Sequence, residues 1–188
     1  MRMFIAVPLP EEVIRSIETV QEKCRPFDLH MKWVRPENCH ITVKFLGEVD
    51  PDHIETFSGA LQELAPKTAP FDVVFSELGF FPRPRRPRVF ILNAPQAEKL
   101  TRFADALESR LRTVSPPRDK CFRAHITLGR FKSGRNLSLL KAALEKLHAA
   151  YRVPVDRIVL YQSTLTKEGP VYEPLGSFLF TGKDSGKE

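Results

Sequence analysis

The feature that most constrains this chain is a tetrapeptide that occurs twice. His40-Ile41-Thr42-Val43 recurs 85 residues later as His125-Ile126-Thr127-Leu128, and both copies lie in β-type sequence. Because side chains alternate along a strand, each copy places its histidine and threonine on one face and its two aliphatic residues on the other. Only five histidines occur in the chain, and two of them stand in these segments. The repeat therefore predicts two similar lobes that face one another across a cleft.

Two imidazoles and two hydroxyls on facing strands suit phosphodiester chemistry without a metal. Histidine titrates near neutral pH, so one neutral ring can take a proton from water while a second, protonated ring gives one to the leaving oxygen. The hydroxyls of Thr42 and Thr127 can donate hydrogen bonds to the phosphate oxygens and hold phosphorus between His40 and His125. One His-x-Thr strand alone is usually a half-exposed polar face, whereas the duplicate indicates a functional pair. The pattern itself does not separate the acid from the base.

Both copies and their flanks resemble the two-histidine phosphoesterases, and within them the bacterial and archaeal RNA 2',3'-cyclic phosphodiesterases, also called 2'-5' RNA ligases. The resemblance covers nearly the whole chain and rests on Arg2 to Ala6, Trp33 to Val49, the proline and arginine run before Val89, and His125 to Arg130. It implies hydrolysis of RNA 2',3'-cyclic phosphate ends to 2'-phosphates, with no metal and no cofactor. It also implies 2'-5' joining by the same residues, with RNA ends such as tRNA fragments as partners.

The same resemblance implies a role for each residue of the site. It makes His40 the proton donor to the 3' oxygen and His125 the acceptor that activates water. Thr42 and Thr127 would bind the phosphate.

The direction of the Arg130 side chain depends on the local backbone conformation. In a regular strand it faces away from His125, but a bulge at Gly129 would aim it at the phosphate. An ordinary solvated arginine is the alternative. Lys44, which shares the His40 face by alternation, has the same two interpretations. Arg123 shares the His125 face by the same rule, and the alternative for this residue is that it lines the rim of the cleft.

A metal site is the first rival interpretation, since His40, His125, Cys39 and Cys121 are all possible ligands. Cys39 directly precedes His40 and so points to the opposite strand face. Cys121 lies four residues before His125, roughly 13 Å along an extended strand. The spacing therefore argues against a metal. The chain has three cysteines, an odd number without paired spacing, which argues against a disulfide framework.

Apolar spacing predicts helices over 10–24, 51–64, 100–111 and 137–147, and β-type runs predict strands over 2–8, 31–34, 39–46, 71–75, 89–92, 121–128, 155–161 and 172–180. The irregular order of these helices and strands along the chain favours an α+β fold with antiparallel sheets. The resemblance adds that residues 1–188 form a single bilobal domain, in which two pseudo-symmetric antiparallel sheets form a central cleft with helices packed on the outside. The polar tail, about 181–188, is expected to fray.

Charge and composition narrow the classes of protein. Lys and Arg number 29 against 23 Asp and Glu, a net charge of +6, which favours phosphorylated or polyanionic partners. A non-catalytic basic RNA-binding module, whose histidines only contact phosphates, is therefore the alternative. No glycine-rich phosphate loop of the common types occurs. No apolar run approaches the roughly 20 residues that a membrane span needs, so we expect a cytoplasmic protein, and the lack of a heptad repeat favours a monomer.

Other residues have more than one interpretation. Phe81 to Arg88 carries four arginines and three prolines, typical of an RNA-contacting loop, of a polyproline-type ligand for another protein, or of a stiff exposed connection. Phe45, Trp33 and Tyr161 can stack on bases, although aromatic residues in strands more often belong to the core.

Overall fold

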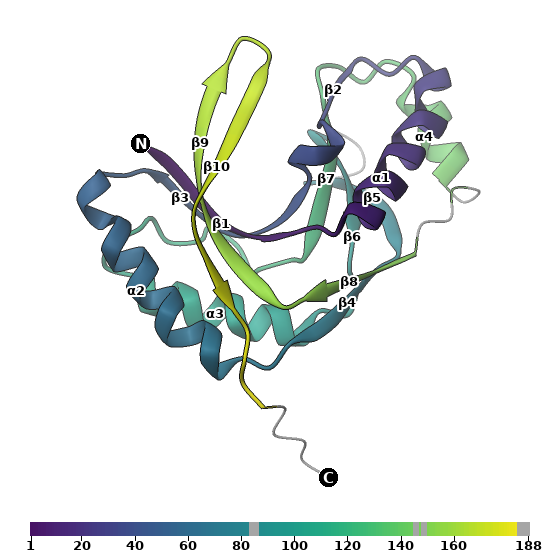
Figure 1. Ribbon diagram of the computed structural model, residues 1–188. Coiled ribbons are helices and arrows are strands. Elements are labelled where there is room, and N and C mark those ends of the chain that lie inside the picture. The colour runs from purple at the N-terminus through teal and green to yellow at the C-terminus, as the bar shows by residue number, and fades with distance from the viewer. Residues whose placement is uncertain (83–86, 145–146, 148–149, 184–188) are drawn as a thin grey trace.

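The computed structural model in Figure 1 describes residues 1–82, 87–144, 147 and 150–183. One antiparallel sheet has eight strands in the order β10-β9-β1-β3-β7-β6-β5, with β2 paired to β7. Its strands are β1 (Arg2–Pro8), β2 (Met31–Trp33), β3 (His40–Glu48), β5 (Glu77–Phe81), β6 (Val89–Asn93), β7 (His125–Phe131), β9 (Arg157–Thr166) and β10 (Gly169–Leu179). A second antiparallel sheet pairs β4 (Phe71–Phe75) with β8 (Tyr151–Val155).

The large sheet consists of two halves that meet between β3 and β7. One half holds β1, β3, β9 and β10, and the other holds β2, β5, β6 and β7. Within the described residues, β3 and β7 pair only through Ile41 and Ile126, and both side chains are fully buried. Burying each contributes about 1.5 to 3 kcal/mol, so the joint is hydrophobic as well as hydrogen-bonded. The predicted α+β class with antiparallel sheets is confirmed, and the chain passes back and forth between the halves.

Four helices pack outside the sheets in the part of the chain that is described: α1 (Glu11–Cys24), α2 (Ile54–Leu64), α3 (Glu98–Leu111) and α4 (Leu137–Leu144). In Figure 1, α2 and α3 lie together against one half, while α1 and α4 lie beside the other. The buried Gln21 of α1 donates hydrogen bonds to the carbonyls of Val34 and Leu128, at 2.8 and 3.0 Å. This side chain therefore fastens α1 to the strand that carries the second motif. None of the described helices is long and apolar enough to cross a membrane.

Three strand predictions differ from the structure. β5 was not predicted, since Glu77 to Phe81 shows no alternation. The strand predicted over 155–161 matches the start of β9 but includes only the last residue of β8, so most of β8 was missed. The chain leaves the β4–β8 sheet at Asp156 and enters the large one. The Asp156 carbonyl accepts a hydrogen bond from the Phe180 N–H at this change of sheet. The strand predicted over 121–128 begins at His125, because the preceding segment runs as a loop.

The C-terminal tail is attached at its start. The Gly182 N–H donates to the Thr68 carbonyl at 3.0 Å. A Cβ on Gly182 would lie 2.7 Å from the backbone of Lys67. The close approach of these two backbone segments therefore requires glycine at position 182. The rest of the predicted tail, 184–188, lies outside the described residues.

Candidate active site

The two motifs lie side by side on one face of the sheet. His40 and Thr42 flank the buried isoleucine of β3, and His125 and Thr127 flank the buried isoleucine of β7. Since these isoleucines form the joint and point into the core, alternation places the four polar side chains on the opposite face. The antiparallel direction brings His40 beside Thr127 and Thr42 beside His125. All four side chains are half-buried.

Each imidazole is oriented by a backbone carbonyl two residues earlier. His40 Nδ1 lies 2.8 Å from the Asn38 carbonyl, and His125 Nδ1 lies 2.8 Å from the Arg123 carbonyl. A carbonyl only accepts hydrogen bonds, so Nδ1 carries the proton in both rings. In each ring Nε2 is then the atom left to take up or release a proton. The two copies of the motif therefore orient their imidazoles in the same way.

The electrostatic surroundings keep His40 neutral in the ligand-free protein. Burial lowers the pKa of His40 to about 4. The hydrogen bond to the Asn38 carbonyl opposes this shift, while the charges of His125 and Arg130 lower the pKa further. Both groups belong to β7, which pairs with β3 next to His40.

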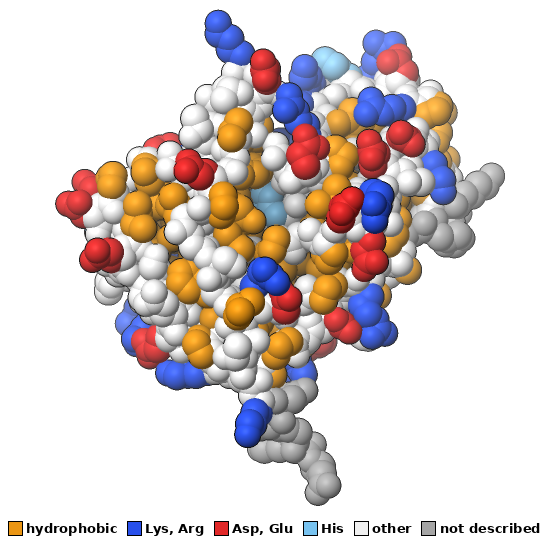
Figure 2. Space-filling view, in the orientation of Figure 1, with side chains coloured by type: hydrophobic (Ala, Val, Ile, Leu, Met, Phe, Trp, Pro, Cys, Tyr) orange, Lys and Arg blue, Asp and Glu red, His pale blue; other side chains and the backbone are white. Residues whose placement is uncertain are grey.

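Aromatic rings pack against both histidines. Phe4 stacks on His40 at a centroid distance of 4.8 Å, and Tyr172 meets it edge-on at 5.3 Å. Phe81 lies parallel to His125 at 6.2 Å. Figure 2 shows a histidine between the two halves, with hydrophobic side chains gathered over β1, β3 and β9. These rings bury the apolar faces of the imidazoles, which accounts for the desolvation of His40.

A β-bulge changes the alternation of β3 after the motif. Thr42 lies opposite Ala6 of β1, Lys44 lies opposite Ile5, and Phe45 lies opposite Phe4. Opposite residues share a face, so Phe45 joins Thr42 on the site face while Lys44 turns to the other side. The exposed fractions agree, at 64% for Phe45 and 3% for Lys44. The prediction that Lys44 shares the His40 face is therefore wrong.

The same bulge occurs in β7 at the equivalent position. Thr127 pairs with Ile91 of β6, and Arg130 pairs with Val89 two residues away, so Thr127 and Arg130 share the site face. A Cβ on Gly129 would lie 2.6 Å from the sulfur of Met31, because β2 packs closely here. The structure therefore has the bulge near Gly129 that the sequence analysis considered. This bulge turns Arg130 toward the site, where its charge acts on His40 and Tyr172.

Lys44 belongs to a buried polar cluster behind the site. Its ammonium donates to Glu108 Oε2 at 2.7 Å and to the Pro116 carbonyl at 3.0 Å. Glu108 Oε1 accepts from the Arg118 N–H at 2.9 Å. These bonds hold the segment between α3 and β7, which leads directly to His125.

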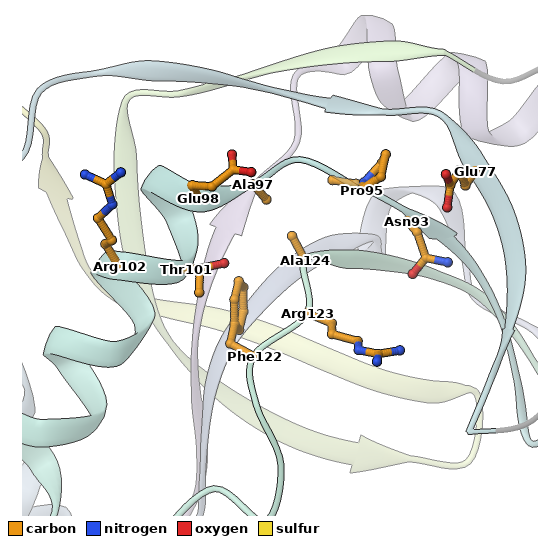
Figure 3. Close-up of a pocket in the computed structure, with 11 residues that line it drawn as sticks. Glu77, Asn93, Pro95, Ala97, Glu98, Thr101, Arg102, Phe122, Arg123 and Ala124 are labelled. Atoms are coloured by element: carbon orange, nitrogen blue, oxygen red, sulfur yellow. The ribbon is translucent and has the colours of Figure 1, made fainter.

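A pocket of about 570 Å³ adjoins the His125 side of the site (Figure 3). Asn93, which pairs with His125, lines it. Arg123 also lines it from outside any strand, so strand alternation does not apply to this residue, and its position fits the alternative that it lines the rim of the cleft. The remaining lining residues are Glu77, Ala94, Pro95, Ala97, Glu98, Thr101, Arg102, Phe122 and Ala124. The mixed acidic, basic and amide groups suit a polar ligand part next to the histidines.

The three cysteines, Cys24, Cys39 and Cys121, are free thiols. Cys39 is buried with its sulfur 3.5 Å from the Thr127 carbonyl, and burial raises its pKa to about 12, whereas Cys121 is exposed. Across the described ranges, no group of three or more His, Cys, Asp or Glu side chains is placed to hold a metal ion. Residues 83–86 of the arginine-rich segment lie outside the described residues. The Trp33 ring packs edge-on against the buried Phe90 ring, with 6.4 Å between the ring centroids.

Comparisons with known proteins agree with this duplicated arrangement. The family model described as LigT like phosphoesterase matches residues 7–91 and again 91–172. The RNA 2',3'-cyclic phosphodiesterase of Archaeoglobus fulgidus is 32% identical over 179 residues, covering 95% of this chain and 99% of its own. That of Aquifex aeolicus is 35% identical, covering 89% and 93%.

Solved structures show the same fold. A protein of Thermus thermophilus superposes with a TM-score of 0.83 at 32% identity, covering 97% of this chain and 100% of its own. LigT of E. coli, complexed with 3'-AMP, gives a TM-score of 0.78 at 26% identity and covers 96% and 98%. The duplicated fold and the paired His-x-Thr strands define a phosphoesterase of the two-histidine class. Within that class, the chain belongs to the LigT-like phosphoesterase family.

Proposed function

We propose that this protein hydrolyses the 2',3'-cyclic phosphate at the end of an RNA to a 2'-phosphate, without a metal or cofactor. The observation that carries the proposal is the matched orientation of two imidazoles, each with Nε2 available, beside two threonine hydroxyls on one face. The curated relatives that are RNA 2',3'-cyclic phosphodiesterases and the 3'-AMP complex of E. coli LigT support it. The reaction needs both halves of the sheet, so residues 1–188 act as one bilobal unit.

In the proposed reaction, His125 is the base and His40 the acid. Water attacks phosphorus as His125 Nε2 takes its proton, the bond from phosphorus to the 3' oxygen breaks, and His40 Nε2–H protonates that oxygen. Thr42 and Thr127 donate hydrogen bonds to the non-bridging oxygens, and Arg130 balances their charge. One proton enters and one leaves the pair, and exchange with solvent restores the starting state.

The proposed acid must gain its proton when substrate binds. His40 is neutral in the ligand-free protein because burial lowers its pKa. A phosphate anion beside the ring favours the imidazolium and so raises the pKa. By linkage, the anion then binds more tightly as the pH falls through this range.

An NMR titration of the His40 ring should show this shift. Without ligand, the midpoint is expected at about 4. With saturating inorganic phosphate it should move upward, because phosphate interacts more strongly with the charged ring. His30, which lies outside the site and contacts Ser133 Oγ, serves as the internal control. An unchanged His40 midpoint would contradict its role as the proton donor.

The activity itself has a direct test. Purified protein in excess EDTA should convert an RNA oligonucleotide with a 2',3'-cyclic phosphate end into the 2'-phosphate product, identified by mass spectrometry and by resistance to a 3'-phosphatase. RNA binding without turnover would instead support the alternative of a basic RNA-binding module.

The same acid and base also suit 2'-5' joining. If the 5'-hydroxyl of a second RNA replaces water, its attack breaks the same bond to the 3' oxygen and leaves a 2'-5' linkage. His125 would deprotonate that hydroxyl, and His40 would protonate the 3' oxygen as before. We propose this joining as a second reaction of the same site.

A further inference from the structure

Three aromatic side chains cross the His40 half of the sheet in a row. Phe4 of β1 lies opposite Phe45 of β3 on one side and opposite Tyr161 of β9 on the other. Directly paired residues share a face, so all three rings lie on the face of the histidines. The ring centroids are 6.5 Å apart for Phe4 and Phe45 and 5.2 Å apart for Phe4 and Tyr161. Tyr172 of β10 adds a fourth ring, 4.9 Å from Phe4.

Within the row, Phe45 is open to solvent, and Tyr161 and Tyr172 are half-buried. Phe45 is 64% exposed, whereas Phe57, Phe75 and Phe90 are fully buried on the core side. Phe4, only 4% exposed, supports the row from beneath and stacks on His40. Exposed apolar surface of this kind next to a reaction site favours a ligand that covers it. In Figure 2, the hydrophobic side chains over β1, β3 and β9 adjoin the histidine between the halves.

Hydrogen bonds hold the β9–β10 hairpin in place for this purpose. Asn38 Nδ2 donates to the Pro170 carbonyl at 3.0 Å, and Arg35 donates to the Glu168 carbonyl at 3.4 Å. The carbonyl of the same Asn38 orients His40. The aromatic surface and the imidazole are therefore positioned by one short segment, which limits the entropy lost when a ligand binds.

The two halves of the site carry different chemistry at equivalent positions. The bulge in β7 turns Arg130 onto the site face, and the bulge in β3 turns Phe45 onto it. A cation suits a phosphate, whereas an aromatic ring suits the flat face of a nucleobase. The difference gives the substrate a direction, with its phosphate near Arg130 and its bases over the aromatic row.

We propose that Phe45, Tyr161 and Tyr172, supported by Phe4, form a stacking platform for the nucleobases at the end of the RNA substrate. This inference rests on the proposed function, because it assigns the bases of that substrate. Every base has a π-face, so the platform recognises the presence of a base and tolerates its identity.

The test compares substrates with and without a base. One is an RNA oligonucleotide ending in a 2',3'-cyclic phosphate, and the other is methyl riboside 2',3'-cyclic phosphate, which has the reacting group alone. Phe45→Ala should lower kcat/KM about tenfold or more for the RNA, mainly through KM, and leave the methyl riboside unchanged. Phe45→Tyr should restore the RNA activity, and Phe45→Leu should not. Val171→Ala is the matched control, since Val171 is 55% exposed on the opposite face of the hairpin.

Each other result has a definite meaning. An equal loss on both substrates would show that Phe45 acts structurally, and no loss on either would overturn the platform. A change in self-association of the variant, measured by light scattering, with unchanged KM would assign the surface to a second copy of the chain instead. If the wild-type protein hydrolyses neither substrate, the proposed function fails. Binding of an RNA ending in a 2'-phosphate, compared between wild type and Phe45→Ala, then still tests the platform.

Discussion

Replacing His40 or His125 with alanine should lower kcat by about 10² to 10⁴-fold, the usual contribution of a general acid or base. The fold should persist, because each ring is half-buried and makes one hydrogen bond to a neighbouring carbonyl. Turnover of RNA cyclic phosphate ends in EDTA, together with the thermal midpoint of unfolding, measures both quantities. His30→Ala is the control for loss of a histidine outside the site.

The pH dependence and the double variant sharpen this experiment. The wild-type kcat should follow a bell-shaped profile, and the residual activity of each single variant should lack one limb. Since the two rings act in one step, removing both should cost little more than removing one. Wild-type turnover in both single variants would exclude the acid and base roles. A large loss of thermal stability would instead assign the histidines to the fold.

Glu108→Ala should destabilise the protein by about 3 to 5 kcal/mol, the usual cost of leaving one partner of a buried ion pair unpaired. The Lys44 side chain is 2% exposed and would be left with only the Pro116 carbonyl as hydrogen-bond acceptor. Urea unfolding measures the change. Glu11→Ala is the control, because the Glu11–Arg15 pair is exposed, and such pairs contribute about 0 to 1 kcal/mol. A result for Glu108→Ala as small as this control would contradict the prediction.

A double variant and the pH dependence of stability separate the contribution of charge from that of packing in this cluster. Lys44→Met combined with Glu108→Leu removes both charges, so it should be much less destabilising than Glu108→Ala. Burial tends to raise the pKa of Glu108, but the hydrogen bond from Lys44 and the charges around it lower the pKa below its usual value. A lowered folded-state pKa stabilises the protein above the unfolded value of 4.5 and loses this effect as the pH falls further.

The motif strands could be predicted from the sequence because alternation is a local property. His40, Thr42, His125 and Thr127 lie on a common face, as period-two spacing requires. Beyond the motifs, the face on which each side chain lies could not be predicted from alternation. A bulge depends on how the partner strand pairs, so alternation placed Lys44 on the wrong face and left Arg130 undecided. The glycine at 129 was the one local signal of the bulge in β7.

The groups that surround the imidazoles could be predicted from the sequence even less well. Asn38 and Arg123 orient the rings through backbone carbonyls, which any residue type supplies. Tyr172 reaches His40 from a strand far along the chain, through pairing of β9 with both β1 and β10. Such contacts follow from tertiary topology, which short sequence windows do not contain.

The narrow joint between β3 and β7 has a mechanical consequence. When one rigid body rocks against another, an atom moves in proportion to its distance from the pivot. The imidazoles stand one residue from the isoleucine pair that forms the pivot, whereas the β9–β10 hairpin and β5 lie at the far edges. Any relative rotation of the two halves about this pair would therefore displace the outer strands more than it displaces the histidines.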